Sequence, residues 1–216
     1  MNALKTSFYR NPNIGLYGFA TDKYCLLGTG VDKKIVKEIK ATLDVPVFEI
    51  NINGSHLVGV YCCGNKDIIL VPEVIRESEE KELKKTGMEY RKIKTKLIAL
   101  GNNIVILDKK CLINPEFEDD VNEQLKDFKV IKMDVAGNST VGSCIIANKN
   151  GCLVSSDVDE KKLKEIGKKF DIKTGVGSVN KGNPFVRSGI ICNSKGYIVG
   201  GETTGVEIMM LEDVLK

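Results

Sequence analysis

The sequence predicts a closed α/β propeller built from five similar repeats. Three observations lead to this fold class. A polar turn followed by a short apolar segment recurs at a nearly constant interval, each unit continues into a segment with apolar residues at helical spacing, and a strand-like segment without a partner stands at the N-terminus. A fixed internal period is typical of repeat architectures, so it indicates the fold before any single motif does.

The recurring polar turns set the period. Their middle residues are Asp22, Lys66, Lys109, Lys149 and Ser194. These positions are 40 to 45 residues apart, so five units of about 43 residues fill residues 1–216 as one predicted domain. Each turn joins two predicted strands, and the first strand of the first four units is entered through Gly15, Gly59, Gly101 and Gly142. In the fifth unit the nearest glycine, Gly189, is displaced by about two residues.

A charged segment with apolar residues at helical spacing follows the second strand of each unit. Four of these segments are marked by Ile35/Ile39/Leu43, Val121/Leu125/Phe128, Leu163/Ile166/Phe170 and Ile208/Leu211/Leu215. The spacing predicts helices that cover a core with one face. We expect their Lys and Glu faces, such as residues 79–82, to be solvated surface.

A third strand is predicted after each of the first four helices, at residues 47–50, 90–93, 130–133 and 172–174. The fifth unit ends with its helix, whereas residues 4–9 at the N-terminus have strand character. This N-terminal strand can complete the fifth unit, which would close the ring and leave no open sheet edge. Closure is also favoured because one short repeat could not bury enough apolar surface to offset its chain entropy.

The composition is that of a globular protein of 216 residues with 42% hydrophobic and 28% charged residues. No apolar run approaches the roughly 20 residues that a membrane span requires, and no signal peptide is predicted, so we expect a cytoplasmic protein. The net charge of +3 is a small excess that differs from the basic stripe of a dedicated nucleic-acid-binding protein.

The residues that usually carry catalysis or bind metals are sparse. The seven cysteines form no C-x-x-C pair, and we interpret them as small buried hydrophobes in a reducing compartment. The single histidine, His56, lies in a turn between the first two units and is predicted to be structural or exposed. Neither Gly28-Thr29-Gly30 nor Gly175-Val176-Gly177 completes a phosphate-binding loop. The sequence therefore predicts a binding scaffold with no cofactor, no metal and no catalytic residue.

Two sets of turns lie at opposite ends of the first strand of each predicted unit. One set joins consecutive units, and the other is the set of hairpin turns within them. Asn and Lys dominate both sets. Such groups can contact phosphates or main-chain carbonyls without reading a sequence.

Short motifs spread over the whole chain carry a family resemblance. They are Asn13-Ile14-Gly15, Tyr24-Cys25-Leu26, Val58-Gly59, Gly64-Asn65-Lys66, Leu70-Val71-Pro72, Ala99-Leu100-Gly101-Asn102, Val141-Gly142-Ser143 and Val179-Asn180-Lys181-Gly182. In these residues the chain resembles the translation initiation factor 6 family in its short archaeal form.

The resemblance implies a pentein fold, which is a five-fold pseudosymmetric α/β propeller. It also implies binding to the joining face of the large ribosomal subunit, near a ribosomal protein and the sarcin-ricin loop of the rRNA, where the factor blocks the small subunit. A part in large-subunit maturation is a further implication, as is release that in eukaryotes is driven by a translocase-like GTPase and its cofactor protein. We expect no membrane partner and a monomer when the protein is free.

Matching positions imply which residues contact the ribosome. Lys66 and Asn102 are the main candidates, and the full set is Asn65, Lys66, Gly101, Asn102, Asn103, Asn180 and Lys181. The family usually has a basic residue after the glycine that corresponds to Gly59, where this chain has Val60.

Two alternatives remain at this stage. The same fold hosts guanidine-modifying enzymes, namely deiminases and amidinotransferases, which use a cysteine nucleophile with histidine and carboxylates near the ring centre. In this chain that would require His56 to point into the central channel. A protein-interaction ring that does not bind the ribosome is the second alternative, and the sequence leaves open which rim of the ring docks.

Overall fold

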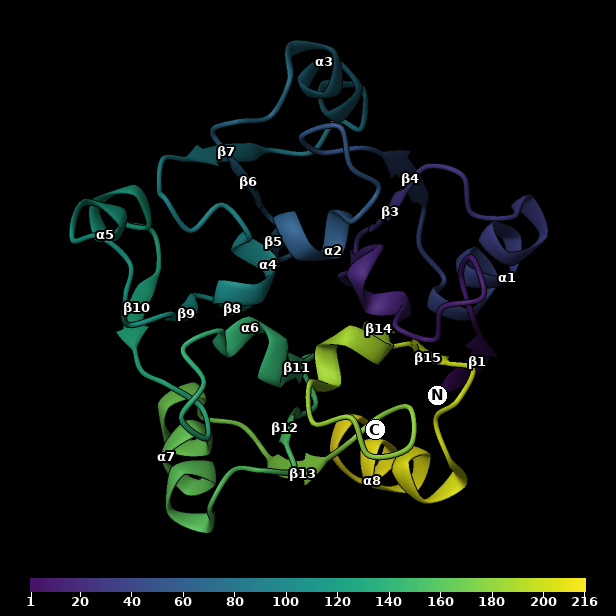
Figure 1. Ribbon diagram of the computed structural model, residues 1–216, viewed down its shortest axis with the longest axis vertical. Helices are drawn as coiled ribbons and strands as arrows, with labels where there is room; N and C mark the ends of the chain where they lie inside the picture. Colours follow the sequence, from purple (N-terminus) through teal and green to yellow (C-terminus); the bar gives the residue numbers. More distant parts are fainter.

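The computed structural model describes residues 1–216, and its strands form five sheets of three strands each. In each sheet the first strand pairs antiparallel with the second, and the second pairs parallel with the third, as in β2-β3-β4. Each sheet with its helices is called a blade. Figure 1 shows the five blades arranged in a ring around a central axis.

The elements recur in the same order in every blade. The first strands are β2 (Gly18–Ala20), β5 (Cys63–Gly64), β8 (Ile104–Leu107), β11 (Ile145–Ala147) and β14 (Ile190–Cys192). The second strands are β3 (Cys25–Gly28), β6 (Ile69–Pro72), β9 (Lys110–Ile113), β12 (Cys152–Ser155) and β15 (Gly196–Gly200). The third strands are β4 (Val47–Ile50), β7 (Tyr90–Ile93), β10 (Lys129–Lys132), β13 (Thr174–Gly177) and β1 (Asn2–Thr6).

Two kinds of helix accompany the strands. The outer helices lie at the periphery of the ring. Four of them connect the second strand of a blade to the third, namely α1 (Lys33–Leu43), α3 (Glu77–Lys85), α5 (Asp120–Gln124) and α7 (Glu160–Phe170), and α8 (Gly205–Leu215) follows β15 as the last element of the chain. The inner helical turns precede the first strands near the axis: η1 (Ile14–Leu16), α2 (Val58–Tyr61), α4 (Leu100–Asn103), α6 (Val141–Cys144) and η2 (Val186–Gly189). None of the helices is both long and apolar enough to cross a bilayer.

The N-terminal strand closes the ring. β1 pairs parallel with β15 over five residues, from Asn2 opposite Gly196 to Thr6 opposite Gly200. The two strands lie beside each other although they stand at opposite ends of the sequence (Figure 1). The predicted strand at residues 4–9 thus exists, but it ends at Thr6 because Phe8 already bridges to Asn11 in the next turn.

Each hydrophobic core is shared by two neighbouring blades. The cluster around Leu43, from blade one, includes Ile191 and Ile198 of blade five, and the cluster around Leu83, from blade two, includes Tyr24 and Leu26 of blade one. The other three clusters join consecutive blades in the same way. A blade therefore completes its core only with its neighbour, which is the physical reason for a closed ring.

Three expectations for individual elements need correction. The third strand of the fourth unit, expected at residues 172–174, spans Thr174–Gly177, because α7 ends at the left-handed Asp171 and residues 172–173 form the connection. α5 ends at Gln124, so Phe128 lies beyond the predicted helix, where the chain between β9 and β10 is shorter than in the other blades.

The third correction concerns Glu79, which was expected to be solvated. Its side chain is only 8% exposed. It accepts hydrogen bonds from the backbone amides of Asn53 and Gly54, at 2.7 and 2.6 Å, and from Arg76 at the start of α3. The carboxylate is therefore buried because it holds a turn between blades, not because it packs with apolar residues.

Candidate functional site

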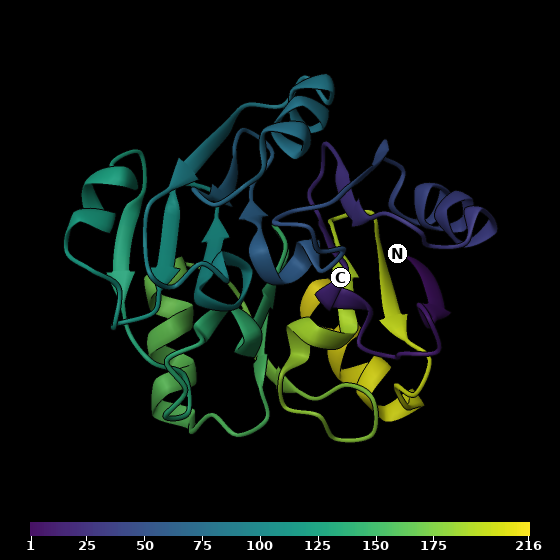
Figure 2. The same ribbon diagram turned by 45° about the horizontal axis from the view of Figure 1, so that its top comes forward.

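The ring has two faces, which are formed by the two sets of turns. The junction face carries the turns that join one blade to the next, around residues 9–13, 53–57, 94–99, 136–140 and 180–185. The hairpin face carries the turns between the first and second strands, around residues 21–24, 65–68, 108–109, 148–151 and 193–195. Because each inner helical turn and first strand runs from one set of turns to the other, the faces lie at opposite ends of the ring axis (Figure 2).

The inner helical turns contact each other closely around the axis. A Cβ atom on Gly59 would lie 2.0 Å from the carbonyl oxygen of Gly15, and one on Gly101 would lie 2.0 Å from that of Gly59. A Cβ atom on Gly142 would lie about as close to the carbonyl oxygen of Gly101, and one on Gly15 to that of Arg187. Only glycine allows this approach, which explains the recurrence of glycine at the start of four units. In the fifth blade Arg187 takes the place of the glycine.

Three cavities follow the axis. The junction-face cavity has a volume of about 330 Å³ and is lined by Asn102, Phe185 and Arg187 among others. A middle cavity of about 40 Å³ is lined mainly by apolar residues and again by Arg187. The hairpin-face cavity, of about 480 Å³, is lined by Asn65 and Lys66 among others. Of the predicted site residues, Asn65 and Lys66 therefore line one opening and Asn102 lines the other.

On the hairpin face, the side chain of Asn65 is engaged in hydrogen bonds within the protein, whereas the side chain of Lys66 makes none. The side-chain oxygen of Asn65 accepts hydrogen bonds from the amides of Asp67 and Ile68, and its Nδ2 donates to the carbonyl oxygen of Asp108 at 2.9 Å. This contact joins the second blade to the third. Lys66 is exposed and forms no ion pair.

The same asparagine contact recurs in other hairpin turns. Nδ2 of Asn148 donates to the carbonyl oxygen of Asn193, and Nδ2 of Asn193 donates to that of Thr21. Both asparagines also accept hydrogen bonds from amides of their own turn. The abundance of asparagine at these turns is thus explained by turn geometry and by the links between blades.

On the junction face, three adjacent predicted residues have three different environments. Gly101 is buried in the contact between inner helical turns. Asn103 is 4% exposed, donates to the carbonyl oxygen of Ala99 and accepts a hydrogen bond from Nδ2 of Asn114. The side chain of Asn102 is half-buried, lines the junction-face cavity and makes no hydrogen bond within the protein. Of the three, only Asn102 presents a free side chain.

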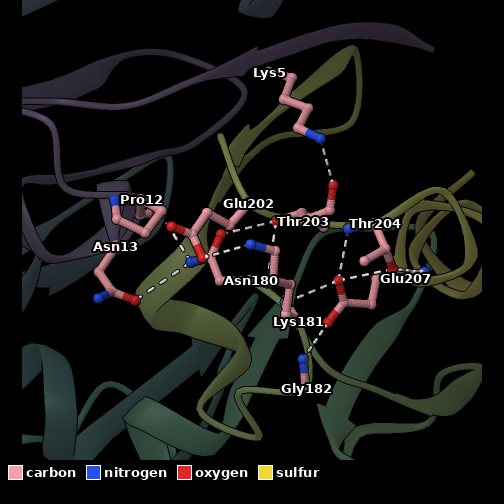
Figure 3. Close-up of polar contacts among 10 residues, drawn as sticks. All are labelled: Lys5, Pro12, Asn13, Asn180, Lys181, Gly182, Glu202, Thr203, Thr204 and Glu207. Carbon is pink, nitrogen blue, oxygen red and sulfur yellow. Dashed lines mark hydrogen bonds and ion pairs between the residues drawn. The ribbon is translucent and has the colours of Figure 1, made fainter.

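Asn180 and Lys181 lie at the junction between the fifth blade and the first (Figure 3). Nδ2 of Asn180 donates to the carbonyl oxygen of Pro12 at 3.0 Å, and its Oδ1 accepts a hydrogen bond from the hydroxyl of Thr203. The side chain of Lys181 is exposed and pairs with Glu202 at 3.4 Å. Asn180 therefore holds the ring closed, whereas Lys181 faces solvent.

Sequence reasoning missed Glu207, which organises this junction (Figure 3). Its carboxylate accepts hydrogen bonds from the amides of Gly182 at 2.8 Å and Thr204 at 2.7 Å and from the hydroxyl of Ser178. Burial would raise the pKa of Glu207, but these hydrogen bonds outweigh it and lower the pKa to about 2. The Thr204-x-x-Glu207 spacing is a capping box, a signal that could have identified it.

His56 lies on the junction face. Its ring stacks on Tyr17 with 5.4 Å between centroids and an angle of 6°, and the ring of Tyr9 lies 5.3 Å away. The side chain is exposed and lines none of the three axial cavities. The prediction of an exposed or structural histidine agrees with this placement.

The cysteines are all free and buried, as the sequence predicts. Cys63 and Cys192 line the middle cavity, and burial raises the pKa of each thiol to about 12, although the charge of Arg187 acts in the opposite direction. Both thiols are therefore protonated at neutral pH. No group of three His, Cys, Asp or Glu side chains is placed to hold a metal ion.

Solved structures with a similar fold define the class of the protein. The chain matches a dimethylarginine dimethylaminohydrolase adduct with S-methyl-L-thiocitrulline at a TM-score of 0.56, with 14% identity over 77% of this chain and 70% of the other. It matches the citrulline complex of the same enzyme from Pseudomonas aeruginosa at a TM-score of 0.53, also with 14% identity, over 76% of this chain and 67% of the other. The five-bladed ring is thus a pentein, an α/β propeller, as predicted.

The sequence comparisons define the family within this class. The model of the eIF-6 family matches residues 3–214. Translation initiation factor 6 of Saccharolobus islandicus is 35% identical over 100% of this chain and 99% of its own length, and that of Pyrococcus abyssi is 32% identical over the same shares. The protein of the same name from Methanocaldococcus jannaschii is 35% identical over 94% of this chain and 93% of its own length. The chain belongs to the eIF-6 family, which makes it a translation factor.

Proposed function

We propose that the protein is an anti-association factor that binds the joining face of the large ribosomal subunit and sterically prevents the small subunit from joining. The observation that carries this proposal is the match to the eIF-6 family over residues 3–214. The closed ring supports it, because a stiff disc held by shared cores can exclude a second large particle without any chemistry.

We infer that the junction face is the docking face. The two groups of predicted contact residues lie at opposite ends of the axis, so one flat surface cannot contact both. On the junction face Asn102 has an unused side chain, and the aromatic residues Tyr9 and Phe185 are 50% and 39% exposed. On the hairpin face the side chain of Asn65 is engaged in hydrogen bonds within the protein, so Lys66 is the one predicted contact residue there with a free side chain. Exposed aromatic and polar groups together are the ordinary composition of an interface.

The factor acts by binding and not by catalysis in this proposal. A guanidine-modifying pentein would need a reactive thiolate near a histidine. The thiols that line the middle cavity have pKa values raised by burial to about 12. His56 stacks on Tyr17 at the junction face instead. The similarity to the hydrolase structures therefore supports a shared fold.

Further parts of the proposal follow from the family alone. The partner region on the large subunit comprises a ribosomal protein and rRNA near the sarcin-ricin loop, and the factor takes part in large-subunit maturation in the cytoplasm. A GTPase with a cofactor protein releases it, and the free factor is a monomer.

Mixing the purified chain with isolated ribosomal subunits tests the proposal. We expect a stoichiometric amount of the chain to co-sediment with large subunits but not with small ones, and to reduce the fraction of coupled ribosomes in a sucrose gradient. Coupling of the subunits at an unchanged level, with the chain at saturating concentration, would contradict the proposed function.

A further inference from the structure

Arg187 breaks the five-fold symmetry of the ring axis. Four blades have glycine at this position of the inner helical turn, and the fifth has an arginine whose side chain lines both the junction-face and the middle cavity. Its Nη2 donates one hydrogen bond across the ring, to the carbonyl oxygen of Cys62 at 3.3 Å. The remaining guanidinium N–H groups have no acceptor within the protein.

The charge of Arg187 has no counter-charge. No carboxylate lies within ion-pair distance of it, and it is the sole ionisable residue other than cysteine that lines either cavity. Removal from water lowers the pKa of the guanidinium, yet arginine remains protonated at neutral pH. Arg187 is half-buried, and none of its guanidinium nitrogens is buried without a partner, so the remaining N–H groups are accessible from the cavity. A partly desolvated cation without a counter-charge favours an anion beside it.

The junction-face cavity offers further hydrogen-bonding groups that the fold does not use. The side chains of Asn102, Thr140 and Ser143 line the cavity, are half-buried, and make no hydrogen bond within the protein. Asn102 comes from α4, and Thr140 and Ser143 come from the N-cap and the body of α6, so two neighbouring inner helical turns present these side chains to the cavity. By contrast, Asn183 and Ser188 are bonded to each other and to Asn13.

We propose that the junction-face cavity binds a phosphate-class oxyanion, with Arg187 pairing with its charge and Asn102, Thr140 and Ser143 hydrogen-bonding to its oxygens. The planar fork of a guanidinium matches two oxygens of such an ion. The volume of about 330 Å³ accommodates the ion with several ordered waters. The inference goes beyond the proposed function and concerns the free protein, so it does not depend on ribosome binding.

Calorimetric titration of the free protein with inorganic phosphate, at constant ionic strength, tests the site. We expect saturable binding of one ion per chain. Arg187→Met should weaken this binding about tenfold or more, because a charge-assisted pair is lost. Lys37→Met is the matched control: Lys37 is an exposed, unpaired lysine on α1, and removing its charge should change the affinity less than about twofold. A parallel titration with adenosine 5′-monophosphate distinguishes a free ion from a phosphorylated small molecule as the ligand.

A second variant keeps the test decisive if Arg187→Met does not fold. Ser143→Asp places a carboxylate in the same cavity and should abolish phosphate binding by supplying the missing counter-charge. Amide NMR shifts should centre on Asn102 and Ser143. Shifts centred elsewhere would indicate an adventitious ion only and would overturn the proposal. Absence of saturable binding to the wild-type chain, or unchanged affinity in both variants, would overturn it equally.

Discussion

The side-chain amide of Asn180 donates a hydrogen bond to the carbonyl oxygen of Pro12, and the two atoms are 3.0 Å apart. These residues lie at opposite ends of the sequence, in the fifth and the first blade. Together with the pairing of β1 and β15, this contact closes the ring at the junction face. Asn180, predicted from the sequence as a ribosome contact, thus has a structural role.

Asn180→Asp should destabilise the fold, because the change removes the donor to Pro12 and places a carboxylate oxygen against a carbonyl oxygen. Aspartate keeps the size of the side chain and tolerates the left-handed backbone of this position, where φ is 50°. We expect a loss of about 1–3 kcal/mol in the free energy of unfolding, measured with urea. Asn122→Asp, on the exposed face of α5, should change it by less than about 0.5 kcal/mol. Equal effects in the two variants would argue against a role of Asn180 in closure.

Gly59→Ala should destabilise the ring strongly. The added methyl group would lie 2.0 Å from the carbonyl oxygen of Gly15, and neither backbone can move without shifting a blade. A loss of about 2–4 kcal/mol is expected, in line with forced overpacking of a core. Gly205→Ala is the matched control, because Gly205 begins α8 with no atom within 4 Å of an added Cβ. That variant should be neutral or more stable by up to about 1 kcal/mol. Thermal unfolding of both variants checks the prediction, which a stable Gly59→Ala protein would refute.

The carboxylate of Glu207 should make the free energy of unfolding depend on pH in the acidic range. Its pKa is lowered to about 2 in the folded protein from an ordinary value of 4.5. The stabilisation is therefore fully present above about pH 5 and is lost as the pH falls toward 2. Glu207→Gln should cost about 1–3 kcal/mol at pH 7, and the difference from the wild type should shrink at pH 3.

Urea unfolding at both pH values measures this difference. Glu202→Gln serves as the control, since its pair with Lys181 is exposed and should contribute less than about 1 kcal/mol at either pH. A Glu207→Gln effect of the same size at pH 7 and pH 3 would show that the charge of Glu207 is not what stabilises the junction.

Asn102→Ser and Lys66→Ala, made separately, should reveal the docking face. We expect Asn102→Ser to weaken co-sedimentation with large subunits by about tenfold, within the usual range for a central contact. Lys66→Ala, on the opposite face, should weaken it by less than about threefold. Both side chains are free of hydrogen bonds within the protein, so the thermal transition should stay nearly unchanged. The reverse order of effects would assign docking to the hairpin face.

All seven thiols should react slowly with iodoacetamide at neutral pH. Burial raises the pKa of Cys25, Cys63, Cys152 and Cys192 to about 12, and every cysteine is shielded from solvent. Mass spectrometry after timed alkylation should show labelling only as the protein unfolds in denaturant. A single thiol that reacts as fast as free cysteine would support the alternative of a guanidine-modifying enzyme.

Local features made much of the fold predictable. The interval between Asp22, Lys66 and Lys109 indicated the repeat, because turn residues and apolar periodicity depend on near neighbours in the chain. The inner helical turns were not predicted, because four residues such as Val58–Tyr61 are too few to show helical spacing. The buried carboxylate of Glu79 was missed because a charged run on a helix is usually solvated, and the amides it binds lie in another blade.

The sequence by itself determined the number of repeats, the order of strands and outer helices within them, the burial of the cysteines and the family. The tertiary structure decided that Lys66 and Asn102 lie on opposite faces, that Asn180 closes the ring, and that Arg187 stands unpaired on the axis. The physical reason is one of distance along the chain. Backbone preference and hydrophobic period act between neighbouring residues, whereas these three relationships join blades that meet only once the ring has formed.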